Sequence, residues 1–176
     1  TTRGVFKLGV RDIVKLILTG FIIGAHWISF FGAARISNVS VSLVGYATCS
    51  LWVAFLEPLA YRVKVKLIEV VLGLAVIAGL YVIFSSDFQF QSGLLLGIFS
   101  GLTAAIFSVI NSKFVKRIPA FTITFYEMIG ACMSTVLFFP FYQMFWAENN
   151  QLQLSPTWLD WFYISILAIA CSVYAY

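Results

Sequence analysis

The chain alternates between long apolar segments and short polar connections. Each apolar segment has about 18 residues or more. A helix of that length rises 1.5 Å per residue, so it crosses the roughly 30 Å hydrocarbon core of a bilayer. The pattern therefore predicts six membrane-spanning helices. Their expected bounds are Leu16–Ala34, Val39–Tyr61, Leu67–Phe84, Gly93–Asn111, Ala120–Phe145 and Leu159–Tyr176.

The apolar segments are continuous, which excludes a transmembrane β-barrel, because barrel strands of about ten residues alternate between polar and apolar side chains. A helix satisfies its backbone hydrogen bonds within itself, as lipid requires. The connections are short, so consecutive helices are expected to run antiparallel. The predicted fold class is an all-α, polytopic transmembrane helix bundle.

Composition agrees with this fold class. Of the 176 residues, 61% are hydrophobic and only 10% are charged, whereas ordinary soluble domains carry about 25% charged residues. A soluble protein of this size would lack the polar side chains that its surface needs. The lipid bilayer is therefore the first expected partner.

Lysine and arginine residues are distributed unevenly among the connections. Ten of the eleven lie in connections at one end of the predicted helices, and Arg35 alone lies at the other end. The other ten lie before the first span, between the second and third, or between the fourth and fifth: Arg3, Lys7, Arg11, Lys15, Arg62, Lys64, Lys66, Lys113, Lys116 and Arg117.

Cytoplasmic loops of membrane proteins carry an excess of these residues. We therefore expect a multi-pass protein of the cell (inner or plasma) membrane with its N-terminus in the cytoplasm and the connection 148–156 outside. The net charge of +4 reflects this topology, so no nucleic-acid partner is predicted.

The sequence offers little catalytic or metal-binding chemistry. Cys49, Cys132 and Cys171 lie in three different predicted spans, without the spacing of a zinc site or a redox pair. A single histidine cannot build a histidine-based metal site. Nucleotide-binding loops and the nucleophile elbow of hydrolases are missing from the sequence. We expect no enzyme activity, no metal and no cofactor.

Three ionisable residues fall within the predicted spans: His26, Glu57 and Glu127. Such groups are costly in hydrocarbon and usually face a bundle interior or an aqueous cavity. The alternative is structural: an interhelical hydrogen bond, or a side chain that reaches out from a helix end. That alternative is favoured for Glu57, which lies close to Arg62 and Lys64 in sequence. For His26 and Glu127 both interpretations stay open.

Glycine recurs in the predicted spans at helical spacing. Gly93, Gly97 and Gly101 are four residues apart and so share one helix face, where a neighbouring backbone can approach closely. Gly20 and Gly24 repeat this spacing in the first span. We interpret these glycines as packing positions. Beside His26, however, Gly24 and Ala25 are expected to leave open space.

Several stretches together carry a family resemblance. They are HWISFFGAARISNVSVSL, FLEPLAYRVKVKLIEVVLGLAVIAGLYVIF, GLLLGIFSGLTAAIFSVINSKFVKR and TFYEM, in that order. In their order and spacing, the chain resembles the EamA-type permeases of the drug/metabolite transporter superfamily. The resemblance runs along nearly all of the chain. It departs from the family at TCSLW, where many members carry a proline, and at Lys64 and Lys66, where many carry an acidic residue.

The resemblance implies ten spans built from two inverted repeats of five. On that template this chain supplies six, about the third to the eighth. Residues 1–90 are the remainder of the first repeat, with three spans, and residues 91–176 are the start of the second, with three more. The similarity between GFIIGAHWISFF and ILAIACSVYAY is the trace of the repeat. We expect a fragment of a longer protein, with flanking helices that complete the bundle.

The resemblance also implies a function, a secondary transporter for small metabolites. Inverted repeats commonly place the substrate site near the midplane between them. Aromatic walls with a few polar groups suit a small amphipathic substrate such as an amino acid, and export is expected. Candidates to line the cavity are His26, Trp27, Phe30, Tyr46, Cys49, Ser100, Phe107, Asn111, Ser172 and Tyr174.

Two alternatives stay open. A sugar-phosphate or nucleotide-sugar transporter of the same superfamily would need cationic residues inside the cavity. A membrane scaffold without transport activity would instead show a dry, fully packed bundle. The sequence leaves the substrate, the coupling ion and the oligomeric state undetermined.

The charge bias makes a topology prediction. In a variant without native cysteines, we expect a membrane-impermeant thiol reagent added outside the cell to label Asn150→Cys and to leave Lys64→Cys unlabelled. Permeabilised cells, in which both positions react, provide the control. Labelling of position 64 without position 150 in intact cells would reverse the orientation.

Overall fold

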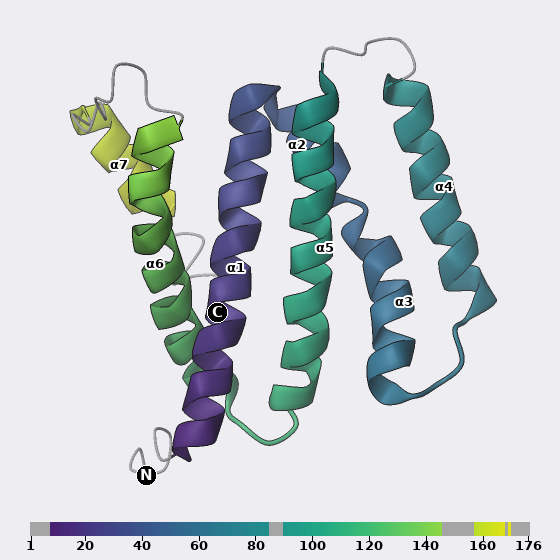
Figure 1. The fold of residues 1–176 in the computed structure, drawn as a ribbon, viewed down its shortest axis with the longest axis horizontal. Helices are drawn as coiled ribbons and strands as arrows, with labels where there is room; N and C mark the ends of the chain where they lie inside the picture. Colours follow the sequence, from purple (N-terminus) through teal and green to yellow (C-terminus); the bar gives the residue numbers. More distant parts are fainter. Residues whose placement is uncertain (1–7, 85–89, 146–156, 168, 170–176) are drawn as a thin grey trace. The chain divides into compact units, whose positions relative to one another are not determined.

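A computed structural model describes residues 8–84, 90–145, 157–167 and 169, and these residues contain helices and no strand. The helices are drawn in Figure 1. Their bounds are α1 Val10–Ile36, α2 Val39–Tyr46, α3 Cys49–Tyr61, α4 Leu67–Phe84, α5 Gln91–Phe114, α6 Ala120–Phe145 and α7 Trp158–Ile166.

The helices agree closely with the predicted spans. α4 and α6 begin and end where the apolar pattern places them, and α1 and α5 extend beyond it at both ends. In the described part of the chain, four helical stretches are long and apolar enough to cross a membrane: 10–36, 39–61, 91–114 and 120–144. Within α4, residues 67–79 form a shorter apolar helical stretch. For the predicted span Leu159–Tyr176, the structure describes α7, whereas residues 170–176 lie outside the described residues.

The second predicted span is divided, and this differs from the single helix expected there. A turn at Ala47 and Thr48 separates α2 from α3. The Thr48 hydroxyl donates a hydrogen bond of 2.7 Å to the Gly45 carbonyl, so a side chain competes with the backbone for that acceptor. Threonine interrupts or bends helices in this way.

The chain divides into two compact units, residues 1–137 and residues 138–176. Within the first unit, α5 packs against α1, α2 and α3, whereas α4 packs against α3. Figure 1 shows α5 between α1 and α3. In the second unit, Thr157 caps α7 in a reciprocal capping box with Asp160.

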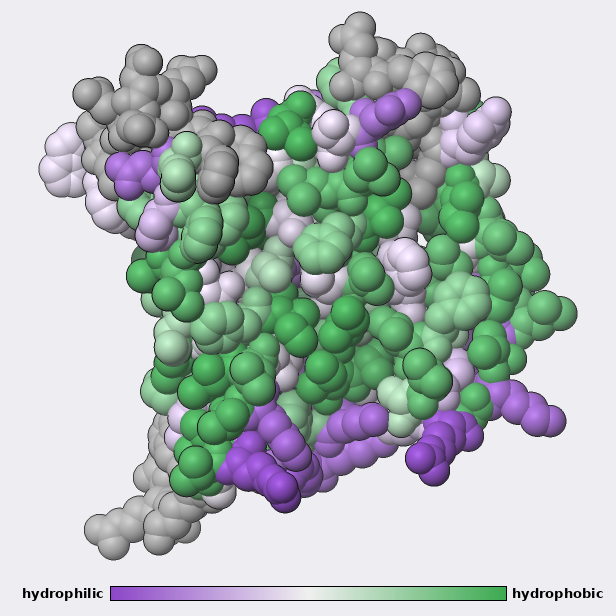
Figure 2. Space-filling model, viewed as in Figure 1, coloured by the Kyte–Doolittle hydropathy of each residue, from purple (hydrophilic) through white to green (hydrophobic). Residues whose placement is uncertain are grey.

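Basic residues of the first unit gather at one end of its helices. The Arg117 guanidinium donates two hydrogen bonds, of 3.0 and 3.2 Å, to the Asp12 carboxylate. The Lys113 ammonium donates one of 2.8 Å to the Ala60 carbonyl. The start of α1 and the ends of α3 and α5 therefore share one side, which Figure 2 shows as a hydrophilic band.

On the face drawn in Figure 2, apolar side chains predominate above that band. Phe31, Leu59 and Leu95 are each about two-thirds exposed or more, as is normal for side chains that face lipid. The packed interior near the basic end is a cluster of Leu16 with three residues from the end of α5, the turn after it and the first turn of α6. Those three are Phe114, Ile118 and Ile123.

Glycines bring the helices of the first unit into backbone contact. A Cβ atom on Gly45 of α2 would lie 2.7 Å from the backbone of Gly97 of α5. Gly93 faces Ser37, and Gly101 faces Thr48. The prediction that this face of α5 serves packing is confirmed.

A second glycine contact joins α1 to α6, where a Cβ on Gly20 would lie 2.8 Å from the Cα of Gly130. Gly24 faces the Ser134 side chain and is buried. The expectation that Gly24 opens space beside His26 is therefore wrong, because α6 fills that space.

These contacts predict which glycines tolerate a methyl group. Gly45→Ala should lower the stability of the purified protein by about 1–3 kcal/mol, because the new Cβ meets a backbone that cannot rotate away. Gly79→Ala is the matched control, since no heavy atom lies within 4 Å of its Cβ position and alanine favours a helix. Thermal unfolding in detergent measures both variants. Equal melting temperatures for the two would contradict the packing assignment.

Candidate functional site

His26 lies midway along α1 and is bonded to α5. Its Nδ1 is 3.0 Å from the Ser100 carbonyl oxygen and 2.8 Å from the Ser100 hydroxyl. A carbonyl oxygen only accepts hydrogen bonds, so this contact requires the proton on Nδ1. In the neutral ring, Nε2 then keeps its lone pair and can accept a hydrogen bond from a ligand.

Three aromatic rings surround the imidazole. The ring centroids of Tyr46, Phe107 and Phe30 lie 5.4, 5.8 and 6.2 Å from that of His26. Phe30 and Tyr46 also meet edge to face at 5.9 Å. We call His26, Phe30, Tyr46, Ser100 and Phe107 the His26 cluster; its members come from α1, α2 and α5.

The small residues of α5 explain why the cluster forms. Gly97 and Gly101 are placed on either side of Ser100, and each lies against α2 or the turn that follows it. Ser100 is fully buried, and both its carbonyl and its hydroxyl lie within hydrogen-bonding distance of His26. The Ser42 hydroxyl donates a hydrogen bond of 2.6 Å to the Phe30 carbonyl and so fixes α2 to α1 beside the rings.

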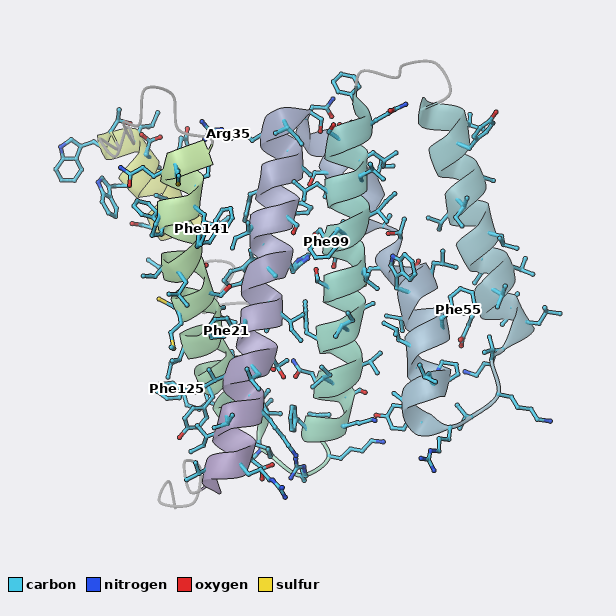
Figure 3. The ribbon with its side chains drawn as sticks, viewed as in Figure 1. Phe21, Arg35, Phe55, Phe99, Phe125 and Phe141 are labelled. Carbon is cyan, nitrogen blue, oxygen red and sulfur yellow. The ribbon has the colours of Figure 1, made fainter. Side chains whose placement is uncertain are left out.

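The cluster is only partly enclosed. Tyr46 is 38% exposed, and His26, Phe30 and Phe107 are half-buried. Figure 3 shows side chains of α1 and α5 meeting between these two helices. The hydrogen bonds and ring contacts of the cluster involve no Lys, Arg, Asp or Glu side chain in the part of the chain that the structure describes. Its chemistry is that of a binding surface: aromatic faces, an imidazole and a phenol hydroxyl.

Two further predicted cavity residues, Trp27 and Cys49, lie close to cluster members along the chain. Trp27 is on α1 and 39% exposed, and Cys49 is a half-buried free thiol at the start of α3. No hydrogen bond or ring contact joins either of them to the His26 cluster among the described residues. Ser172 and Tyr174 lie outside the described residues.

Asn111 belongs to a different polar contact. Its side-chain amide donates a hydrogen bond of 3.1 Å to Glu127 of α6, and Glu127 is only 3% exposed. Of the predicted intramembrane ionisable residues, Glu127 thus lies in the interior of the first unit, whereas His26 is half-buried. Glu57 is exposed and borders a groove of about 300 Å³ that Glu69 also lines.

A contact between α3 and α5 at the basic end is absent from the predictions made from the sequence. The Tyr61 and Ser112 hydroxyls are 2.7 Å apart, and the Lys116 ammonium lies 4.4 Å from the centre of the Tyr61 ring. The aromatic residue beside a basic turn was a usable signal, because cations favour aromatic faces. The indole N–H of Trp52 on α3 is buried and has no hydrogen-bond partner in the part of the chain that the structure describes. No feature of the sequence indicates this.

Comparison with known proteins identifies part of the chain. Residues 91–176 match the family model described as the EamA-like transporter family, which is a transporter family and not an enzyme family. No curated protein and no solved structure matches the chain. In the described residues, no group of three or more His, Cys, Asp or Glu side chains could hold a metal ion.

Proposed function

Because residues 91–176 match the model of the EamA-like transporter family, whose members are membrane transporters, we propose that this chain binds a small amphipathic metabolite at the His26 cluster and exports it. Amino acids and related compounds are the proposed substrate class. The observation that carries the proposal is the convergence of one imidazole and three aromatic rings from three helices.

Physical complementarity supports that substrate class. Binding sites for small molecules combine apolar walls with a few polar groups that fix orientation. Here the rings of Phe30 and Phe107 supply apolar walls, while His26 Nε2 and the Tyr46 hydroxyl supply polar groups. An ammonium group can also rest against an aromatic face, a contact worth about 0.5–2 kcal/mol.

The two alternatives receive less support. A sugar-phosphate or nucleotide-sugar substrate calls for cationic side chains at the site, yet every described Lys and Arg lies in a connection or within the first six or last two residues of a helix. Arg35, in the last turn of α1, is nine residues from His26, or about 13 Å along the helix. A scaffold without transport activity has no need of a partly exposed imidazole among rings.

The family template supplies the proposed architecture. Residues 1–90 contribute three spans of a first repeat and residues 91–176 three of a second, inverted repeat. Flanking helices complete the ten spans, and the span starting at Leu159 is the inverted counterpart of the one starting at Leu16. The shared basic end of α1, α3 and α5 supports a cytoplasmic location for that end.

Transport by the complete ten-span protein tests the proposal. In proteoliposomes, Phe107→Leu should raise the KM for a transported amino acid by about 2- to 10-fold, because an aromatic contact is worth about 0.5–1.5 kcal/mol. Initial rates over a range of radiolabelled amino acid concentrations measure this change.

Phe99→Leu provides the matched control, since Phe99 lies on the same helix (Figure 3) and is 48% exposed but makes no ring contact with His26 among the described residues. It should leave KM unchanged. Equal effects of the two substitutions would remove the His26 cluster from the substrate pathway. Absence of flux for every small metabolite tested would contradict the transport function itself.

A further inference from the structure

Glu127 and Asn111 form a second polar site on α5, apart from the His26 cluster. Asn111 is eleven residues from Ser100, so the two sites are about 16 Å apart along the helix. Glu127 lies seven residues into α6, about 10 Å along a helix that could cross the membrane. The carboxyl group is almost completely buried, with 3% of the residue exposed.

The Glu127–Asn111 pair lacks a hydrogen-bond donor. The Asn111 amide nitrogen donates to Glu127 Oε2 at 3.1 Å. The other oxygen of each group, Glu127 Oε1 and Asn111 Oδ1, is buried without a hydrogen-bond partner among the described residues. Both atoms are acceptors when the carboxyl group is ionised. A buried polar atom without a partner costs about 1–3 kcal/mol, and more when it is charged.

We propose that Glu127 and Asn111 form a proton-binding site in the interior of the bundle. A proton taken up from the aqueous phase forms an O–H bond at Oε1 and converts the carboxylate into a neutral carboxylic acid. That group then offers one donor and one acceptor, as the asparagine amide does. A single proton therefore removes the buried charge and supplies the donor that Oε1 and Oδ1 both lack.

Charged groups near the pair come from α1, from α5 and from the turn that follows α5. From α1, Gly20 packs against the backbone of Glu127. Lys15 is five residues and Asp12 eight residues before Gly20, about 7 and 12 Å along α1; Arg11 precedes both, and His26 lies six residues further on. Asp12 is paired with Arg117.

From α5, the nearest charged residue is Lys113, and its ammonium donates to the Ala60 carbonyl. Lys116, in the turn that follows, rests on the Tyr61 ring. On α6 itself, Tyr126 adjoins Glu127 in sequence and packs against the apolar cluster around Leu16. No basic side chain is hydrogen-bonded to the Glu127 carboxyl group among the described residues, so a proton is the available neutralising charge.

A metal cation fits the pair less well. Hard cations such as Ca²⁺ or Mg²⁺ take about six or more oxygen ligands. Among the described residues, this site offers only two oxygens without a hydrogen-bond partner, Glu127 Oε1 and Asn111 Oδ1. A proton needs only one carboxylate oxygen and one acceptor. The structure thus favours the proton over a metal.

The role of the site rests on the proposed transport function. Both sites use α5, because Ser100 holds His26 and Asn111 holds Glu127. Uptake and release of the proton changes the hydrogen bonding between α5 and α6, while the substrate contacts α5 and α1. Proton movement at Glu127 is in this way coupled to substrate movement at the His26 cluster.

Infrared spectroscopy of the protein in lipid detects the proton directly. The wild type should show the C=O stretching band of a protonated carboxylic acid, and alkalinisation should remove it. Glu127→Gln should abolish this band, because glutamine keeps the size and the hydrogen bonding of the carboxylic acid but carries no carboxyl group. Asn111→Ala should move the band to higher frequency, since the carbonyl oxygen loses a hydrogen bond.

Glu69→Gln is the control, because the Glu69 carboxylate is paired with Lys66 at 3.1 Å near the start of α4; it should leave the band intact. The proposal is overturned if no wild-type band is lost in Glu127→Gln, as would occur with a carboxylate hydrated by water. If Glu127→Gln fails to fold, the frequency shift in Asn111→Ala decides the question, and an unchanged frequency overturns the pairing.

A transport measurement separates this site from the proposed function. With an imposed pH gradient, the wild type should accumulate substrate, whereas Glu127→Gln should only equilibrate it. Equal gradient-driven accumulation by both proteins overturns the coupling role. If the wild type transports nothing but shows the Glu127 band, the proposed function is wrong and the proton-binding site stands.

Discussion

The close approach of α5 to α1 and α2 is the constraint on which the first unit depends. In lipid, apolar side chains gain no hydrophobic free energy when two helices associate. Helices therefore associate through tight packing of small residues and through interhelical hydrogen bonds. Gly97 against Gly45 brings two backbones together. Ser100, between Gly97 and Gly101, can then reach His26 with both its carbonyl and its hydroxyl.

The same contact accounts for the chemistry of the His26 cluster. A histidine within a bilayer needs a hydrogen-bond partner, and Ser100 provides one while leaving the second ring nitrogen for other contacts. The turn between α2 and α3 lies where Gly101 faces Thr48, and it places the Tyr46 ring at 5.4 Å from the imidazole. The histidine therefore forms an interhelical hydrogen bond and is also part of the proposed substrate site.

Much of the fold could be predicted from the sequence, because helix length in a membrane is dictated by hydrophobic thickness. The bounds of α4 and α6 follow from where the apolar residues begin and end. The turn at Ala47 and Thr48 could not be predicted, because it depends on a hydroxyl competing for the Gly45 carbonyl. Gly24 was misjudged because helix spacing shows which residues share a face but does not identify the helix that covers it.

The candidate site was predictable in part for a similar reason. Five of the proposed cavity residues meet, since midspan aromatic and polar residues of adjacent helices tend to face inward. Asn111 instead faces Glu127, although they are sixteen residues apart in consecutive helices. Their pairing depends on how α5 and α6 rotate about their axes, and packing of Gly20 against Gly130 sets that rotation for α6. No local pattern in the sequence contains this information.

Substrate protection at Tyr46 tests the central claim most directly. In the complete transporter without native cysteines, Tyr46→Cys should react with a small thiol reagent, and substrate at ten times its Kd should slow that reaction about elevenfold if only the unoccupied protein reacts. Tyr81→Cys on α4, at a position that is 74% exposed, should react at the same rate with and without substrate. An unprotected thiol at position 46 under saturating substrate would contradict the assignment of the His26 cluster as the substrate site.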